Sequence, residues 1–357
     1  MNLGTNDVIL VTGATGFIGA WCVERALRTG ARVRGTCRDP KANGKVAFLK
    51  ALPGAAERLE LVALDLTGPA DGFERAVHGC TAVLHVASPL TPTGPATDEY
   101  YVKPAVEGTL GMLRACDSES GAGVRRVVVT SSVGAVGFGN DKIFTEADWK
   151  DPKQFTPYTK SKTLAEKAAW EYYKEKKPKW SMVCVLPGAV LGPALSGEAA
   201  KGSLQVLSRM IGRMMPMAPP LTLCVVDVRD VAEAHIQALV KPEAEGRRIL
   251  CCADHATSLL ELSGMVRSMY GQYGYNPPTR QAPYFLMWIV SYFDAGIGML
   301  LPQMNVSTRY DVAPLRTVLG VELRPLDATV RDGCDSLVLH GVVPKLGDVP
   351  VQWAPPS

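Results

Sequence analysis

Three glycines at three-residue spacing follow an apolar run near the amino terminus, and they constrain the fold more than any other feature. The stretch VILVTGATGFIGAW, residues 8–21, begins as a buried strand would and then contains Gly13, Gly16 and Gly19. A strand ending at Thr12 and a helix opening at Gly16 direct free backbone N–H groups and a positive helix end at the turn, which suits a pyrophosphate. Glycines there permit the tight turn and the close approach of a phosphate.

The glycine spacing is G-x-x-G-x-x-G rather than the commoner G-x-G-x-x-G, and a tight turn without a ligand is the alternative interpretation. Its place after the first strand of an alternating series favours dinucleotide binding. We expect the cofactor to contact Gly13, Thr15, Gly16, Phe17, Ile18 and Gly19.

Apolar segments alternate with helical patterns through the first half of the chain. The patterns predict strands at 8–12, 32–38, 59–65, 81–87 and 125–132, and helices at 16–29, 45–52, 72–78 and 104–116. They continue with a helix at 157–175, a strand that ends at Pro187-Gly188, and further strands and a helix within 221–253. This alternation predicts an α/β fold of the Rossmann type, a doubly wound parallel sheet covered by helices on both faces.

The later segments no longer alternate cleanly, which predicts a smaller lobe made of several segments. Residues 1–188 with about 222–254 are expected to form the cofactor domain, and about 189–221 with 255–330 the substrate-binding lobe. Residues 331–357 are expected to form a C-terminal helix and tail. The most apolar stretch, residues 284–301, is interrupted by Asp294 and is too short for a membrane span. It predicts a buried or cleft-covering helix, with contact to a membrane surface as the alternative.

The end of the second predicted strand bears on which dinucleotide binds. An acidic residue there bonds the ribose hydroxyls of NAD, whereas an arginine suits the 2′-phosphate of NADP. The strand ends in Arg38, with Asp39 after it and Lys45 nearby. NADP(H) is therefore favoured over NAD(H), although Asp39 could itself turn toward the ribose.

Two further strand ends should meet the cofactor at the carboxyl edge of the sheet. Asp65 and Leu66 follow the third strand, where Asp65 could accept a hydrogen bond from the adenine amino group or cap the next helix. The fourth strand ends in His85, followed by three residues expected to contact the cofactor, Val86, Ala87 and Ser88. His85 itself fits a packed strand-end residue better than a catalyst.

Tyr158 and Lys162 give the strongest chemical signal. They lie four residues apart on one face of a predicted helix, so the phenol and the ammonium can address the same ligand. A neighbouring cation lowers the pKa of a tyrosine and improves it as a general acid-base. TSSVGAV, residues 130–136, ends a strand at the same sheet edge, and Ser132 there can donate to a carbonyl oxygen. Ser131 is the neighbouring candidate, but its side chain should point to the opposite side of an extended segment.

An ordered set of motifs resembles the extended short-chain dehydrogenase/reductase superfamily, and more narrowly its dihydroflavonol-4-reductase-like branch with microbial aldehyde and ketone reductases. These motifs are TGATGFIG, CRDP, LDL, HVASP, KPAVEGTLGML, VVVTSS, YTKSKTLAE, VLPGAVLGP and VDVRDVAEAHI, with LGVELRPLDATVRDGCDSLV near the end. The resemblance implies an NADPH-dependent carbonyl reductase. In it Ser132 polarises the carbonyl, Tyr158 delivers the proton, and Lys162 holds the nicotinamide ribose and lowers the pKa of Tyr158. Pro187, Gly188 and Val190 match the family's contacts to the nicotinamide end.

Two departures from relatives limit the substrate. Gly137 stands where flavonoid-specific members have asparagine, and DPKQFTPYTKSK lacks the cinnamoyl-CoA reductase signature before the catalytic tyrosine. The expected substrate is a small-molecule carbonyl compound, apolar or aromatic. Alternatives are an NAD-dependent 3β-hydroxysteroid dehydrogenase, a nucleotide-sugar epimerase, or a non-catalytic NADP(H)-binding scaffold.

Composition excludes several other classes. A net charge of +3 with scattered basic residues gives no nucleic-acid patch. Nine cysteines without a C-x-x-C pair, of which only Cys251 and Cys252 are adjacent, and the absence of a secretory pattern indicate a reducing, cytoplasmic setting. Five histidines without metal-ligand spacing predict no metal site. A monomer and a homodimer are both compatible with the sequence.

Overall fold

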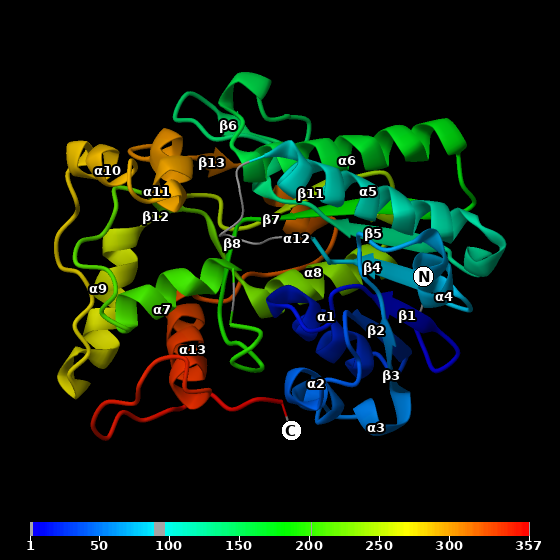
Figure 1. The fold of residues 1–357 in the computed structure, drawn as a ribbon, viewed down its shortest axis with the longest axis horizontal. Helices are drawn as coiled ribbons and strands as arrows, with labels where there is room; N and C mark the ends of the chain where they lie inside the picture. The colour runs from blue at the N-terminus through cyan, green and yellow to red at the C-terminus, as the bar shows by residue number, and fades with distance from the viewer. Residues whose placement is uncertain (1–2, 89–96, 201, 357) are drawn as a thin grey trace.

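A seven-stranded parallel sheet forms the centre of the molecule. The structure is a computed structural model that describes residues 3–88, 97–200 and 202–356. The sheet has the order β11-β7-β5-β4-β1-β2-β3, and the direction of strand succession reverses between β1 and β4 (Figure 1). Its strands are β1 (Val8–Val11), β2 (Arg32–Cys37), β3 (Leu59–Ala63), β4 (Ala82–His85), β5 (Arg126–Thr130), β7 (Ser181–Pro187) and β11 (Arg248–Cys251). The prediction of a Rossmann-type fold is confirmed.

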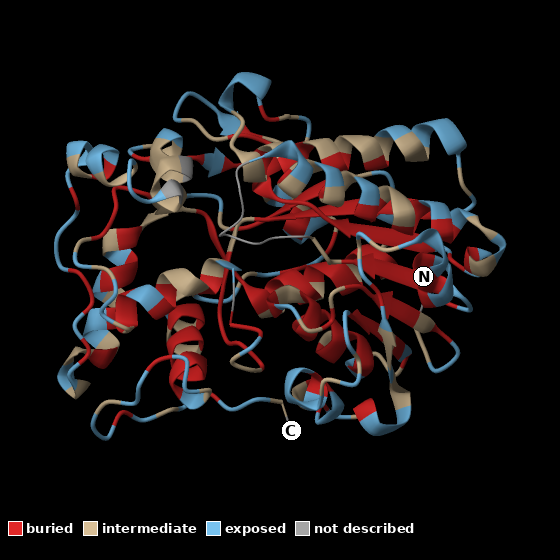
Figure 2. Cartoon of the chain, viewed as in Figure 1, coloured by how far each residue is buried: buried red, intermediate tan, exposed pale blue. Residues whose placement is uncertain are grey.

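The central strands are buried along their whole length, as Figure 2 shows. β5 reads RVVVT and β7 reads SMVCVLP, continuous apolar runs of the kind that a sheet covered on both faces requires. β3, at the edge of the sheet, contains no fully buried residue. The polar ends of the central strands, and not their middles, are therefore available for chemistry.

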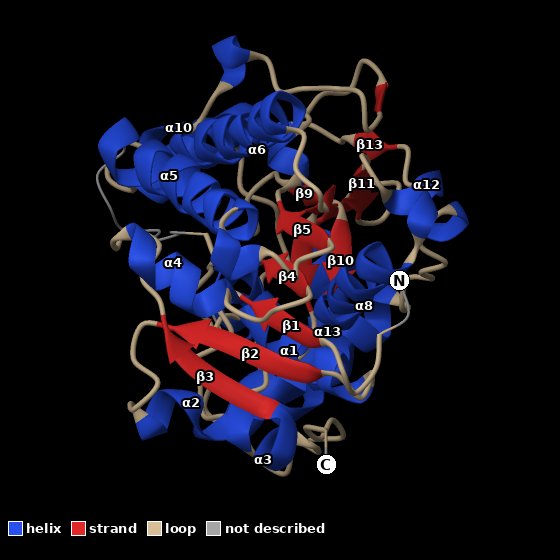
Figure 3. Ribbon diagram, turned by 90° about the vertical axis from the view of Figure 1, so that its right-hand side faces the viewer, coloured by secondary structure: helices blue, strands red, loops and turns tan. Residues whose placement is uncertain are grey.

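Helices cover both faces of this sheet (Figures 1 and 3). α1 (Phe17–Arg28) and α8 (Val228–Val240) pack against each other on one face, while α5 (Asp98–Asp117) packs between α4 (Ala70–Val77) and α6 (Pro157–Lys176) on the other. Two short helices, α2 (Asn43–Lys50) and α3 (Ala55–Arg58), connect β2 to β3. The carboxyl ends of β1, β4 and β5 therefore lie between the two layers of helices.

Helix α5 starts earlier than the sequence pattern predicts. The sequence pattern predicts a helix from around Pro104 to Cys116. In the structure the helix begins at Asp98, since the Thr97 side chain accepts a hydrogen bond from the Tyr100 N–H and caps it. Pro104 lies inside the helix.

Most of the remaining elements gather as a smaller lobe, to the left of the sheet in Figure 1. Three small two-stranded sheets join distant segments: β6 (Ile143–Phe144) with β13 (Arg309–Tyr310), β8 (Ala189–Leu191) with β10 (Val225–Asp227), and β9 (Thr222–Leu223) with β12 (Thr257–Ser258). Helices of this lobe are α7 (Gln205–Ile211), α9 (Leu259–Tyr270), α10 (Tyr284–Val290), α11 (Ala295–Leu300) and α13 (Leu326–Leu339), whereas α12 (Ala313–Thr317) lies beside β11 of the central sheet. α13 packs on α7 and α9. It starts at Leu326, before residue 331, where the sequence predicts that the C-terminal helix begins. The predicted domain boundaries stay a prediction.

The apolar stretch 284–301 is not the single helix, buried or covering a cleft, that its composition predicts. It forms α10 and α11, because the Asp294 carboxylate accepts hydrogen bonds from the N–H groups of Gly296 and Ile297 and starts a second helix. Only Met287 of α10 is buried, and exposed aromatic side chains extend to Phe293, which is 88% exposed. Within the described part of the chain, no helix combines the length and the apolar character needed to cross a membrane.

Candidate active site

The glycine loop lies at the carboxyl end of β1 and is shaped by close backbone approaches. Gly13 has φ +67°, and a Cβ there would lie 3.1 Å from Ala87 at the end of β4. At Gly19, in the first turn of α1, a Cβ would lie only 2.1 Å from the Gly13 carbonyl oxygen. Gly16 caps α1 without any side-chain hydrogen bond and is exposed, so the first N–H groups of the helix face the loop. This cradle fits a dinucleotide pyrophosphate.

A buried polar pair joins the loop to β4. Thr12 Oγ1 lies 3.1 Å from His85 Nδ1 and accepts a hydrogen bond from the Ala87 N–H at 3.0 Å. Burial, with a smaller effect of the Lys162 charge, lowers the pKa of His85 to about 4, so the imidazole is neutral near pH 7. His85 is a packed strand-end residue, as the sequence indicated. Val86, Ala87 and Ser88 follow it along the same edge, partly exposed.

At the end of β2, Arg38 is exposed and its charge contributes to lowering the pKa of Asp65. The larger cause of that lowered pKa is local, because Asp65 Oδ1 accepts hydrogen bonds from the Thr67 N–H at 2.9 Å and the Thr67 hydroxyl at 2.8 Å. Asp39 is likewise engaged in its own turn, accepting from the Lys41 N–H at 2.9 Å.

Asp39 therefore bonds within its own turn and not to Arg38, and Asp65 stabilises the turn that contains Thr67. Leu66 is partly buried and lies next to α5, where a Cβ on Gly108 would lie 3.1 Å from the Leu66 Cβ. Lys45 lies exposed in the first turn of α2, and no interaction among the described residues joins it to Arg38.

The two serines after β5 point in different directions. Ser131 Oγ donates to Glu166 at 2.5 Å and is buried behind the sheet edge. Ser132 Oγ accepts from the Gly134 N–H at 3.0 Å and shares a hydrogen bond with the Tyr158 phenol. Because successive side chains of an extended segment alternate, fixing Ser131 on one side places Ser132 on the other.

Helix α6 presents Tyr158 and Lys162 to this serine. Its start is defined by a capping box, in which the Thr156 side chain accepts from the Thr159 N–H and the Thr159 hydroxyl accepts from the Thr156 N–H. Pro157 occupies the first helical position. Tyr158 therefore lies in the first turn, and Lys162 Nζ donates to the Thr130 carbonyl at 3.2 Å, next to Ser132.

The charges at this point differ in part from the sequence expectation. Burial raises the pKa of Tyr158, and the hydrogen bond with Ser132 partly offsets the increase. The predicted lowering of this pKa by Lys162 is not what the structure shows, because burial is the largest effect on the Tyr158 pKa and raises it. Burial lowers the pKa of Lys162 itself to about 8, against an opposing effect of Glu166. Near pH 7 the tyrosine is a protonated phenol and the lysine is mostly a cation.

Beyond Ser132 the sheet edge continues to the end of β7. Pro187 is buried, and a Cβ on Gly188 would lie 2.2 Å from the Cys224 carbonyl oxygen, so only glycine fits there. Val190, on β8, is buried, and its carbonyl accepts from the Ser203 hydroxyl at 2.6 Å. The strand order thus aligns the ends of β3, β2, β1, β4, β5 and β7 along one edge.

Sequence reasoning missed one residue of this region, Glu166. It lies one turn beyond Lys162 on α6, and its buried carboxylate binds Ser131 and Arg248. The signal was present as the four-residue spacing of Tyr158, Lys162, Glu166 and Trp170 along one helix face.

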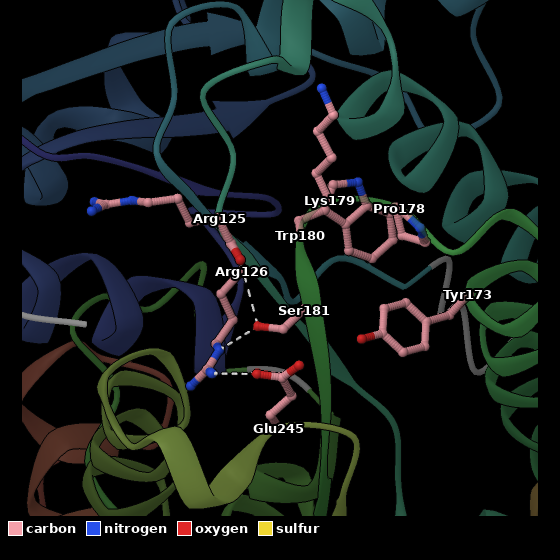
Figure 4. Close-up of a pocket in the computed structure, with 8 residues that line it drawn as sticks. All are labelled: Arg125, Arg126, Tyr173, Pro178, Lys179, Trp180, Ser181 and Glu245. Carbon is pink, nitrogen blue, oxygen red and sulfur yellow. Dashed lines mark hydrogen bonds and ion pairs between the residues drawn. The ribbon is translucent and has the colours of Figure 1, made fainter.

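Two cavities lie away from this edge. One of about 470 Å³ is at the amino ends of β5 and β7, where Arg126, Tyr173, Trp180 and Glu245 form its walls (Figure 4). The other, of about 640 Å³, lies between α1, α8 and the C-terminal segment. Neither includes a predicted site residue. Among residues 3–88, 97–200 and 202–356, no group of three or more His, Cys, Asp or Glu side chains could hold a metal ion.

The family model described as the NAD dependent epimerase/dehydratase family matches residues 9–252, which include the glycine loop and all three candidate catalytic residues. The chain belongs to this family. Its predicted place among the extended short-chain dehydrogenase/reductases of dihydroflavonol-4-reductase type is confirmed as well. It is 35% identical over 274 residues to dihydroflavonol 4-reductase of Zea mays, covering 74% of this chain and 75% of that protein.

Two further similarities extend over more of the family member's length. The chain is 32% identical over 346 residues to cinnamoyl-CoA reductase CAD2 of Medicago truncatula, covering 94% of this chain and 96% of the relative. The crystal structure of Gre2 from Candida albicans in complex with NADPH has a TM-score of 0.77 at 25% identity, covering 94% of this chain and 99% of the other. Similarity therefore includes the smaller lobe as well as the sheet.

Proposed function

We propose that this protein is an NADPH-dependent carbonyl reductase that converts an aldehyde or ketone to an alcohol. The observation that carries the proposal is the contact between Ser132 and Tyr158, with Lys162 fixed at Thr130, on the sheet edge that also holds the glycine loop. A hydroxyl, a phenol and a cation at one point suit reduction of a carbonyl group. NADPH, when bound, supplies the hydride.

Each residue has a role that follows from its state. Ser132 donates to the carbonyl oxygen and holds it beside Tyr158, and Tyr158 gives its proton to that oxygen as the alcohol forms. Because burial keeps Tyr158 protonated, the donor is in the required form at neutral pH. Lys162 contributes a fixed positive charge beside the phenol and a donor for the nicotinamide ribose.

The cofactor preference is supported by the end of β2. Arg38 is exposed at the place where a 2′-phosphate would lie, while the Asp39 carboxylate is occupied by the Lys41 N–H. A ribose-binding carboxylate, as NAD-retaining epimerases use, is therefore less available here than a guanidinium. Gly13, Gly16 and Gly19 would hold the pyrophosphate, and Pro187, Gly188 and Val190 would lie toward the nicotinamide.

The substrate proposed is a small apolar or aromatic carbonyl compound. A flavonoid-type asparagine at Gly137 has no room, because a Cβ there would lie 2.5 Å from the Phe144 ring and the residue has φ +151°. The proposal is tested by following NADPH absorbance with purified protein and a panel of aldehydes and ketones. Multiple turnovers with at least one carbonyl are expected. Retention of bound NADPH without turnover on any compound would favour the non-catalytic scaffold.

Replacing Arg38 by Asp should weaken the preference for NADPH over NADH. Loss of the guanidinium and the added negative charge oppose a 2′-phosphate, so KM for NADPH is expected to rise at least about ten-fold while KM for NADH changes little. Arg32→Asp, at the exposed amino end of the same strand, is the matched control and should leave both values unchanged. An unaltered preference in Arg38→Asp would show that the 2′-phosphate is held elsewhere.

A further inference from the structure

Behind the candidate catalytic residues lies a buried ion pair that the reaction does not use directly. Glu166 and Arg248 have side chains that are 1% and 8% exposed, and they are joined by hydrogen bonds of 2.6 Å and 3.2 Å. A buried ion pair is weak evidence for stability alone, because desolvation offsets most of the attraction. The place of this ion pair directly beside Ser131 and one helical turn from Lys162 therefore suggests a role in function.

The carboxylate of Glu166 is fully committed by its surroundings. Oε1 accepts from Arg248 Nε at 2.6 Å and from the Trp170 indole at 3.3 Å, while Oε2 accepts from Ser131 Oγ at 2.5 Å and Arg248 Nη2 at 3.2 Å. Four donors from three elements hold this carboxylate in a single orientation.

Arg248 is anchored just as firmly on its other side. Its Nη1 donates to the carbonyls of Glu146 and Asp148 at 2.7 Å and 2.6 Å, and its guanidinium lies 3.6 Å from the centre of the Trp149 ring. The pair thus connects α6, β11, the end of β5 and the segment around residues 146–149. A displacement of any of these would move the residues beside Ser132.

We propose that Glu166 is a positioning residue, which Arg248 holds in place so that it orients Ser132 through Ser131 and keeps Lys162 positively charged. The proposal rests on the function proposed above. Ser131 is directly bonded to Glu166, and Lys162 lies one helical turn from it on the same face of α6.

The other titratable groups around Lys162 carry no negative charge that could stabilise its ammonium. His85 on β4 and His235 on α8 each have a pKa of about 4 because of burial, so both are neutral near pH 7. Burial raises the pKa of Tyr158 on α6 and of Cys184 on β7, which keeps them uncharged. Arg248 is a cation on the far side of the carboxylate. Glu166 is therefore the anion available to favour the protonated lysine.

The test is the titration of Lys162 in the cofactor-free protein, followed by carbon-13 NMR of lysine side chains and assigned with Lys162→Arg. In Glu166→Gln the midpoint should fall by about one pH unit or more, because an attractive charge is lost while burial remains. Ser131→Ala, which keeps both charges, should leave the midpoint unchanged. Equal midpoints in wild type and Glu166→Gln would overturn the charge role.

A second variant covers the case in which Glu166→Gln fails to fold with an unpaired buried arginine. In Glu166→Gln/Arg248→Met no unpaired cation is left, and the Lys162 midpoint should still fall, by less than in the single variant. An unchanged midpoint in this folded double variant also contradicts the proposal.

Turnover separates the two halves of the proposal. Ser131→Ala should lower kcat by a similar factor at every pH, whereas Glu166→Gln should also move the alkaline limb of its pH profile downward. A normal kcat in Ser131→Ala would overturn the orienting role. The NMR titration needs neither cofactor nor substrate, so its result does not depend on the reductase assignment. The reductase assignment is contradicted separately, if the wild-type protein shows no turnover.

Discussion

Tyr158→Phe is expected to lower turnover by about 10² to 10⁴-fold while leaving NADPH affinity nearly unchanged. The change removes only the phenolic oxygen, which shares a hydrogen bond with Ser132, and keeps the ring that packs at the start of α6. Without the hydroxyl, the carbonyl oxygen loses the proton donor that the proposed function assigns to Tyr158. Steady-state kinetics and a fluorescence titration with NADPH measure the two effects separately.

A matched control lies on the same helix. Tyr172→Phe removes a hydroxyl that bonds Asp117 at 3.2 Å, away from the sheet edge, and should leave kcat within a few-fold of wild type. If Tyr158→Phe kept comparable turnover, or lost NADPH binding to the same extent as activity, the proton-donor role would be wrong.

Gly19→Ala is expected to weaken NADPH binding by at least about ten-fold, or about 1.4 kcal/mol, and to lower thermal stability. The reason is space alone, because the new Cβ would lie 2.1 Å from the Gly13 carbonyl oxygen and 2.9 Å from its carbon. Either α1 or the loop must move, and both form the proposed phosphate cradle. Titration with NADPH and a melting curve of the free protein measure the two consequences.

Gly264→Ala provides the comparison, since Gly264 lies exposed in α9 with no atom within 4 Å of its added Cβ. Alanine there should leave NADPH binding unchanged and improve stability slightly. Wild-type affinity in Gly19→Ala would mean that the close packing of α1 on the loop is not needed for the cofactor.

The sheet and the cofactor edge were predictable because they depend on local patterns. Gly13, Gly16 and Gly19 directly follow an apolar strand. The alternation of strand and helix that begins there continues up to β5. The four-residue spacing of Tyr158 and Lys162 puts both side chains on one helix face, whatever the position of α6 in the fold. Their meeting with Ser132 then follows from the parallel sheet, whose strand ends share an edge.

What escaped prediction depends on contacts between distant segments. Glu166 and Arg248 are 82 positions apart, and nothing local marks either as half of an ion pair. The Thr130 carbonyl that binds Lys162 is a backbone group without any sequence signature. In the smaller lobe, pairings such as β6 with β13 hold short segments that have no periodicity of their own.

The balance of charges at Tyr158 also needed the structure. From spacing alone the cation appears as the group that lowers the tyrosine pKa, whereas burial in the folded protein has the larger effect and raises it. A protonated phenol is the form that carbonyl reduction requires, so the correction strengthens the proposed direction of the reaction.

Deuterium transfer tests the central claim most directly. Purified protein is incubated with a carbonyl compound and NADPH that carries deuterium at both C4 positions, and the alcohol is analysed by mass spectrometry. The proposed function predicts an alcohol with a single deuterium on the former carbonyl carbon, formed by wild type and lost in Tyr158→Phe. Binding of the labelled cofactor without any deuterated alcohol, across the aldehyde and ketone panel, would contradict it.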